Sequence, residues 1–221
     1  MIILQRKSQA LWIKGDKQGA VKILVAAIKK APSQLDNYLE LAAYLNALQD
    51  VTQAEKLLRS ALVRFPHNQD IYYSLGTTYY AAASYSRALS EFKKITLPRL
   101  QNDKLYMLAS TYYAQKDYGH ALAFAVTAQQ RQPKQVDVNL LAGDCFLAIG
   151  DFSHAETYYR QALDQAPASA PANFKLGLTA MAQGKSNAAY FKQAKKQDAA
   201  YFAREKHKLT DIERYLKAQQ K

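Results

Sequence analysis

The sequence predicts an all-α fold of about six stacked helical hairpins, because small residues and prolines recur along it with one period. The first column holds alanines 33 or 34 residues apart: Ala20, Ala54, Ala88, Ala121, Ala155 and Ala189. Seven residues after each of the first five comes a second small or aliphatic residue: Ala27, Ala61, Ile95, Ala128 and Ala162. The third column, in the same register, holds Pro32, Pro66, Pro133 and Pro167. Self-similarity at a fixed period of this size is typical of solenoid proteins.

Each repeat unit is predicted to form two helices joined by a tight turn. An apolar stripe of about fourteen residues comes first. A turn signal such as Gly15-Asp16 or Gly150-Asp151 follows, and a second stripe then ends at the proline. Proline cannot continue a helix, so it separates one hairpin from the next. The predicted units are about 1–34, 35–68, 69–101, 102–135, 136–169 and 170–197, and a capping helical segment spans 198–221.

The strongest units carry a family pattern. The third unit reads Tyr72-x2-Leu75-Gly76-x2-Tyr79, followed by Ala88-x3-Phe92. This resembles the tetratricopeptide repeat (TPR), whose pattern is W-x2-L-G-x2-Y…A-x3-F…P. The resemblance runs from residue 1 to about 196. It implies a right-handed superhelical solenoid whose first helices line a concave surface, and a scaffold that binds other proteins.

Three stretches depart from the pattern. The first unit has Lys7-Ser8 where Leu-Gly is usual, which predicts an edge unit. The junction 95–102 is one residue short and carries Pro98 early, which predicts an altered superhelical twist. The sixth unit loses the pattern after Ala189. In the capping segment, an amphipathic helical face and a possible capping box are predicted from Phe202, Leu209, Ile212 and Leu216, and from Thr210 with Glu213.

No group of side chains suggests an active site. The four histidines lie far apart in the sequence, without metal-ligand spacing, and His120 and His154 are expected at exposed helix starts. Cys145, the single cysteine, is expected to be a buried structural thiol. The glycines are isolated, so no loop suits a phosphate. We therefore predict that the protein is not an enzyme and uses no cofactor or metal.

The sequence also bears on location. No apolar run approaches the ~20 residues needed to span a bilayer. Arg6 and Lys7 follow the first apolar residues, whereas a secretory signal carries its charge before them. The expectation is a cytoplasmic protein, or the soluble part of a longer, anchored chain.

Two positions in each first helix are predicted to face the concave surface that the resemblance implies. They lie two turns apart, so they share a helical face. The predicted partner-binding residues are Trp12, Leu39, Asn46, Tyr73, Tyr80, Tyr106, Tyr113, Leu140, Leu147, Phe174 and Met181, whereas Tyr72, Tyr79 and Tyr112 are predicted core. Tyrosine joins a large apolar face to a hydroxyl, which suits a binding surface. The prediction is a Tyr-rich groove for a peptide or helix of a partner protein. In the alternative, some of these residues pack against the next hairpin.

The net charge of +12 is concentrated at the two ends. Residues 1–32 and 185–221 each carry +6, and the residues between them sum to zero. Within that middle, acids prevail on the predicted first helices and bases on the second, which predicts a mildly acidic inner face. Asp36, Asp70, Asp103 and Asp137 each open a first helix, where the helix dipole favours a carboxylate. The alternative function is association with nucleic acid or another anionic surface through the basic ends.

Overall fold

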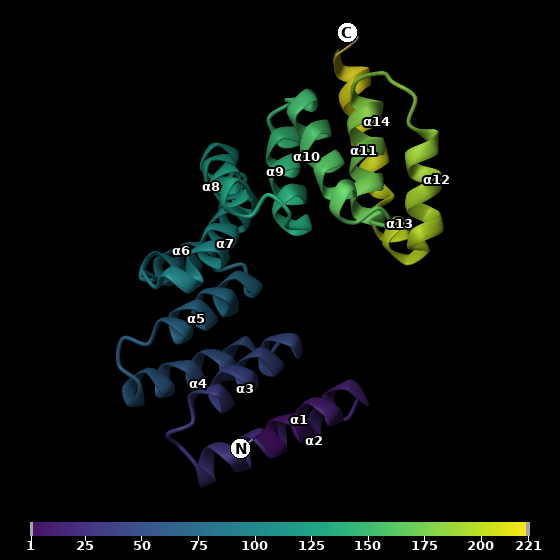
Figure 1. Cartoon of the computed structure of the whole chain (residues 1–221). Helices are drawn as coiled ribbons and strands as arrows, with labels where there is room; N and C mark the ends of the chain where they lie inside the picture. The colour runs from purple at the N-terminus through teal and green to yellow at the C-terminus, as the bar shows by residue number, and fades with distance from the viewer. Residues whose placement is uncertain (1, 220–221) are drawn as a thin grey trace. The chain divides into compact units, whose positions relative to one another are not determined.

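The computed structural model describes residues 2–219, with side chains described for residues 6–212 and 214, and all of its regular structure is helical (Figure 1). The all-α prediction is confirmed. The helices form six successive pairs, which we call hairpins 1 to 6: α1 (Ile2–Ile13) with α2 (Lys17–Lys30), α3 (Leu35–Ala47) with α4 (Val51–Arg64), α5 (Gln69–Ala81) with α6 (Tyr85–Lys93), α7 (Gln101–Ala114) with α8 (Tyr118–Arg131), α9 (Val136–Ala148) with α10 (Phe152–Gln165), and α11 (Ala170–Ala182) with α12 (Ala188–Gln197). A 3₁₀ turn, η1 (Pro98–Leu100), precedes α7, and α13 (Ala199–Glu205) and α14 (His207–Gln219) follow α12.

The chain divides into two compact units, residues 1–107 and 108–221. In the first unit, α2, α3, α4 and α5 each pack against the helix that follows, and α3 also contacts α5. In the second unit, the helices from α8 to α13 pack in the same sequential way, and α9 also contacts α11. Contact between the first helices of successive hairpins is what a stack of repeats requires, because one hairpin cannot bury its apolar face alone.

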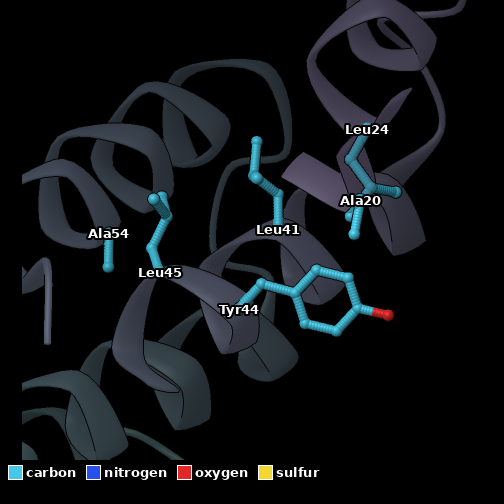
Figure 2. Close-up of a cluster of buried hydrophobic side chains, with 6 residues drawn as sticks. All are labelled: Ala20, Leu24, Leu41, Tyr44, Leu45 and Ala54. Atoms are coloured by element: carbon cyan, nitrogen blue, oxygen red, sulfur yellow. The ribbon is translucent and has the colours of Figure 1, made fainter. Parts of the chain in front are cut away.

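The core of hairpins 1 and 2 shows why alanine recurs (Figure 2). Ala20 and Ala54 are fully buried, and both belong to one cluster with Leu24, Leu41 and Leu45. Tyr44 completes this cluster, and its ring lies beside the aliphatic side chains. A larger residue at either alanine would force the helices apart, because protein interiors have few voids to absorb added volume.

Glycine sets the same close approach in the later hairpins. A Cβ atom built on Gly76 would lie 2.4 Å from the ring of Phe92, and one on Gly143 would lie 2.4 Å from the ring of Tyr159. Both rings are fully buried core groups. The Leu-Gly and aromatic positions of the pattern are therefore one contact: the missing side chain makes room for the ring of the second helix.

The prediction that Ala189 takes the buried alanine position of hairpin 6 is wrong. Ala189 is exposed, whereas the other alanines of its column are buried. The ring that meets the glycine of this hairpin is Phe191, 2.5 Å from a Cβ built on Gly177. Phe191 follows its glycine by fourteen residues, whereas Phe92 follows Gly76 by sixteen. The spacing from glycine to ring is thus two residues shorter in hairpin 6, although the segment between its two helices, residues 183–187, is longer than the turns of the other hairpins. Asn187 takes the place of the alanine, and the pattern continues through the buried Ala194.

The C-terminal segment packs on hairpin 6, but one detail of its prediction is wrong. Phe202, Leu209 and Ile212 pack against a cluster that contains Phe174 and Leu178. This agrees with the predicted apolar face. Thr210 and Glu213 do not form a capping box at a helix start, because α14 already begins at His207. The side chain of Leu216 lies outside the described residues.

The junction before α7 is closed by Gln69, the first residue of α5. Its Oε1 accepts hydrogen bonds from the backbone N–H groups of Thr96 and Leu97 at 2.6 and 2.7 Å. Arg99 in η1 forms an ion pair with Asp70 at 2.5 Å. These contacts satisfy the backbone of an irregular segment. The altered twist at this junction stays a prediction.

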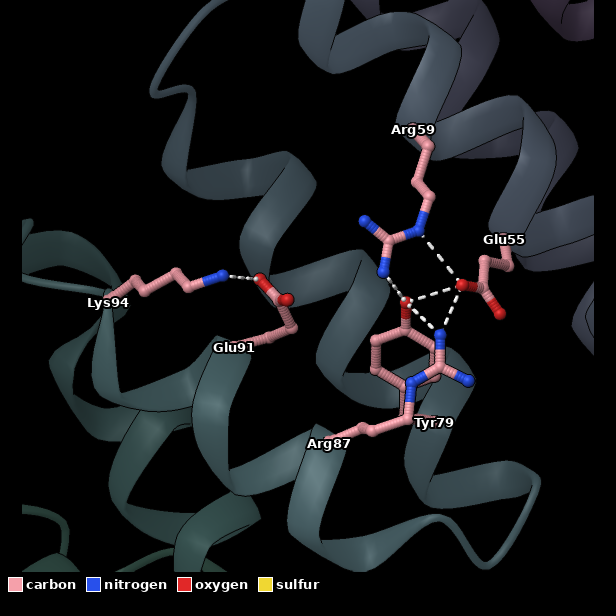
Figure 3. A network of polar contacts seen from close by, with 6 residues as sticks. All are labelled: Glu55, Arg59, Tyr79, Arg87, Glu91 and Lys94. Atoms are coloured by element: carbon pink, nitrogen blue, oxygen red, sulfur yellow. Dashed lines mark hydrogen bonds and ion pairs between the residues drawn. The ribbon is translucent and has the colours of Figure 1, made fainter.

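A polar network joins hairpin 2 to hairpin 3 (Figure 3). The Glu55 carboxylate on α4 accepts hydrogen bonds from Arg59 Nε and from the Tyr79 hydroxyl, both at 2.9 Å. Arg87 on α6 also donates to Glu55, and its guanidinium lies 3.9 Å from the centre of the Tyr79 ring. Burial of Glu55 raises its pKa, but these hydrogen bonds outweigh that effect and hold the pKa below its usual value.

We expect Glu55→Gln to lower the free energy of unfolding at pH 7 by about 1–2 kcal/mol, because the buried Tyr79 hydroxyl and two guanidinium groups lose a charged acceptor. The lowered pKa means that the carboxylate stabilises the fold above the unfolded-state pKa, near ~4.3. That contribution is lost as the pH falls through the lower folded-state pKa. Urea unfolding of both proteins at pH 7 and pH 3 measures it. A difference that stays unchanged at pH 3 would contradict the network.

The turns inside the hairpins require a left-handed residue. The positive φ values at this position are 90° for Gly15, 62° for Gln49, 53° for Ala83, 63° for Lys116, 82° for Gly150 and 67° for Gly184. Residues with a Cβ are strained in this conformation, and glycine is not. Three of the six turns therefore carry a residue that the backbone disfavours.

We expect Ala83→Gly to raise the free energy of unfolding by about 1 kcal/mol, since it removes the Cβ at a φ of 53°. The matched control is Ala82→Gly. Ala82 is the neighbouring exposed alanine with a φ of −83°, and glycine there brings only an entropic cost. Chemical denaturation of both variants separates the two cases. Equal effects would show that backbone strain is absent at residue 83.

Candidate functional site

Hairpin 3 shows how one helix serves both the core and a surface. Tyr79 is 1% exposed, and its pKa is raised by burial and by the adjacent Glu55. Tyr80, the next residue, is only half-buried, and its ring lies 6.0 Å from that of Tyr85 on α6. Neighbouring residues of a helix differ in direction by about 100°. Because Tyr79 is fixed in the core, Tyr80 is held on another face of α5.

The pairing of Tyr80 with Tyr85 recurs in hairpin 4. Tyr113 at the end of α7 lies 5.4 Å from Tyr118 at the start of α8, with ring planes 57° apart. All four of these tyrosines are half-buried. The second member of each pair, Tyr85 or Tyr118, was missed in the sequence. The signal is its place five residues after the predicted inner tyrosine, across the tight turn.

In the first unit, the predicted inner residues Tyr73 and Tyr106 lie near each other. Burial raises the pKa of Tyr73, with further contributions from Asp103 and Tyr106. The Tyr73 ring also lies 6.0 Å from that of Phe92. Both tyrosines are half-buried, and Asp103 is exposed. Hairpin 3 and the start of α7 thus bring two phenol rings and a carboxylate together.

Two further predicted residues of the first unit, Trp12 and Asn46, are used in packing. The half-buried Trp12 stacks on Tyr44 with ring centres 4.0 Å apart, and the Lys17 ammonium lies 4.0 Å from the indole centre. Asn46 donates to Thr78 Oγ1 at 2.9 Å, which ties α3 to α5. Leu39 is half-buried. The contacts of Trp12 and Asn46 therefore agree with the alternative interpretation, in which these residues pack against the next hairpin.

In the second unit, one predicted residue is core. Phe174 is 1% exposed and lies between Phe191, Tyr201 and Phe202, with ring centres at 5.5, 6.0 and 5.6 Å. The capping segment covers this side chain, so Phe174 is a core residue of the structure and not the open part of a binding surface that the sequence predicts. The aromatic side chains of the capping segment cover this position. The other predicted residues of this unit, Leu140, Leu147 and Met181, are half-buried.

The prediction of Tyr112 as a core residue needs a correction. Tyr112 is half-buried and forms a stack with His120 and Phe124, at centre distances of 4.9 and 5.6 Å. His120 is exposed as predicted, and its Nδ1 lies 2.8 Å from the Asp117 carboxylate that caps α8. His154 repeats this arrangement with Asp151, at 2.7 Å.

An acidic group beside Tyr113 is neutralised within the chain. Asp144 on α9 forms an ion pair with Lys175 on α11, and both side chains are at least four-fifths buried. The Tyr159 hydroxyl donates to the same carboxylate at 2.8 Å. Burial, and then the charge of Asp144, raise the pKa of Tyr113. In hairpin 2, Glu40 likewise accepts hydrogen bonds from Ser8 and Tyr44. The carboxylates of Asp144 and Glu40 are therefore hydrogen-bonded within the chain.

The basic ends are exposed where they are described. Lys192, Lys195, Lys196 and Lys206 all lie on the surface. The tyrosine pairs lie on other helices than these lysines. Association with an anionic surface stays a prediction.

Cys145 is buried, and burial raises the pKa of its thiol to about 12, so it is unreactive as a nucleophile. Among the described side chains, no three of the His, Cys, Asp and Glu type come together as a metal site would require. None of the described helices has the length and apolar character of a membrane span.

Comparison with known proteins places the repeat in a family. Family models described as "Tetratricopeptide repeat" match residues 45–110, 106–170 and 140–202. A curated mouse (Mus musculus) protein, "Interferon-induced protein with tetratricopeptide repeats 2", is 32% identical over 78 residues, which cover 35% of this chain. That stretch spans only 16% of the mouse protein.

Solved structures share the fold at low sequence identity. PilW, a type IV pilus biogenesis factor, is 17% identical with a TM-score of 0.78, covering 88% of this chain and 91% of its own. The pilF protein of Pseudomonas aeruginosa is 17% identical with a TM-score of 0.73, covering 90% and 91%. YrrB, a TPR protein with an unusual peptide-binding site, is 19% identical with a TM-score of 0.60, covering 84% and 97%. At these identities the likeness concerns the fold alone.

The family matches together run from residue 45 to residue 202, more than half of the chain. The same stretch contains the buried contacts of Gly76 with Phe92 and of Gly143 with Tyr159, which are the spatial form of the family pattern. From the sequence columns, the helical hairpins and these matches, the chain belongs to the tetratricopeptide repeat family.

Proposed function

We propose that this protein is a scaffold that binds a segment of a partner protein through the tyrosines on the inner positions of its first helices. The observation that carries the proposal is the repeated pair, Tyr80 with Tyr85 and Tyr113 with Tyr118. Each pair offers two tilted rings that remain partly exposed beside a fully packed hairpin core. Rigid aromatic groups of this kind bury a large apolar area on binding at a low cost in side-chain entropy.

The chemistry of the surroundings suggests what the partner segment carries. Apolar side chains would lie against the phenol rings, and the hydroxyls would form hydrogen bonds with the peptide backbone or with polar side chains. Asp103, exposed near Tyr73 and Tyr106, favours a basic residue in the ligand. YrrB, which shares this fold, has a peptide-binding site, and this supports peptide binding as a use of the fold. The proposed partner is an extended or helical peptide with apolar and basic residues.

The test starts from peptides selected on the full-length chain from a random display library. We expect the double variant Tyr80→Ala, Tyr113→Ala to bind the enriched peptides at least tenfold more weakly, because a truncated aromatic anchor typically costs about 2 kcal/mol or more. Isothermal titration calorimetry gives the affinities. Since both rings are partly exposed, the thermal unfolding curve of the variant should stay close to that of the wild type.

Two controls define the outcome. Tyr158→Ala removes another half-buried tyrosine, which stacks on Phe146 at 5.3 Å and lies away from the predicted inner positions. It should leave peptide affinity unchanged. Tyr79→Ala should instead destabilise the fold by roughly 3–5 kcal/mol, as the loss of a buried aromatic group does. Peptides that bind the double variant as tightly as the wild type would refute the tyrosine assignment.

A further inference from the structure

The C-terminal helix α14 covers inner residues of the second unit. Leu209 and Ile212 of α14 pack against the cluster of Phe174 and Leu178 on α11. α14 and α11 are in contact and run side by side in Figure 1. Ile212 also approaches the end of α9, where it lines a pocket with Leu147. Leu147 is the hairpin 5 counterpart of Tyr80 and Tyr113.

The surface beneath α14 repeats the arrangement of the tyrosine pairs. Phe152 stands five residues after Leu147, as Tyr85 stands after Tyr80. Leu147 and Phe152 both line the pocket, together with Ile149, which is 49% exposed. In hairpin 5, the inner pair is thus apolar and has a helix of the same chain over it. This shows what kind of element fits the inner face: an amphipathic helix with aliphatic residues three apart.

The fit of α14 is loose. A pocket of about 360 Å³ remains between α14 and the α9–α10 turn. Side chains that border a void lose dispersion contacts on that side. The ion pairs recorded for the described side chains of α14 stay within the C-terminal segment, Lys208 with Glu205 at 2.7 Å and Arg214 with Asp211 at 3.8 Å. Among the described side chains of α14, Leu209 and Ile212 therefore make the main contacts with the hairpins.

The segment just before α14 is held differently. Tyr201 and Phe202 of α13 pack on the buried Phe174 with near-perpendicular rings, at interplanar angles of 87° and 83°. Phe202 also contacts Phe191 of α12. The short helix α13 therefore covers the end of the hydrophobic core. Loss of α14 from the inner face would leave this cap in place.

We propose that α14 is a displaceable internal ligand, and that a partner's amphipathic helix binds hairpins 5 and 6 by taking its place. This rests on the proposed function. The partner helix carries aliphatic residues at i and i+3, like Leu209 and Ile212, and a large apolar side chain that fills the pocket beside Leu147 and Phe152. Because α14 is tethered, it competes at a high effective concentration, so an incoming helix must make the better fit.

The first test uses a fluorescent peptide of residues 206–221 and needs no outside partner, so its result does not depend on the tyrosine pairs. We expect the full-length variant Leu209→Asp, Ile212→Asp, whose own α14 is released, to bind the peptide at least tenfold more tightly than the wild type. Thr210→Asp, on the exposed side of α14, should give no gain. Adding Leu147→Asp to the released variant should abolish the gain. Equal binding by released variant and wild type would overturn the proposal.

A second measurement avoids any folding defect in the variants. In hydrogen exchange of the wild-type chain, amides of α14 should exchange at least tenfold faster than those of α11, while those of α13 stay protected. Protection of α14 equal to that of α11 would make it a fixed part of the fold and overturn the proposal. A concentration-dependent dimer in which α14 is exchanged would assign the surface to a second copy of the chain, and would also overturn it.

Discussion

The close approach of the two helices within each hairpin is the constraint on which the rest of the structure depends. At Gly76 there is no room for a Cβ, because the ring of Phe92 occupies its position. That contact sets the distance between the helices, and the distance sets which side chains are buried. Hairpin 6 keeps the contact through Phe191 although the segment between its helices is longer and the glycine-to-ring spacing is two residues shorter, so the ring is preserved and the buried alanine is not. The spacing of the helices is therefore a stronger requirement than the length of the turn.

A second consequence concerns direction. The ring of Tyr79 is buried in the core, and its hydroxyl donates a hydrogen bond to Glu55 and accepts one from Arg59. These contacts fix the rotation of α5 about its axis. Tyr80 then projects from a fixed face of α5. In this way polar contacts between hairpins, which contribute little net free energy each, decide what the protein presents to a partner. The same reasoning holds for α9, where Asp144 and Lys175 fix the helix that carries Leu147.

Much of the fold could be predicted from the sequence, because the repeat makes each unit a test of the others. The two columns of small or aliphatic residues and the proline column predicted the hairpins, and the turn signals between the apolar stripes predicted nearly all of their turns. The columns failed where the spacing changed: Ala189 keeps the count of residues, but the contact with Gly177 is made by Phe191, which places Asn187 at the alanine position. The candidate site was harder. Phe174 occupies an inner position by register, yet α13 and α14 cover it, and no periodic pattern reports what a non-repeating segment packs against. Tyr85 and Tyr118 were missed because pairing across a turn depends on three-dimensional closeness.

The buried thiol of Cys145 has a practical consequence. It is the single cysteine of the chain, it lies in the core, and its raised pKa keeps it protonated at neutral pH. Alkylating reagents attack the thiolate, so we expect the native protein to react only slowly with maleimides. A cysteine introduced at an exposed position is then the sole reactive site, and paired labels can report distances between chosen helices in solution without first removing a native residue. Reactivity of Cys145 itself would signal that hairpin 5 has opened, which makes the wild-type chain its own probe of local unfolding.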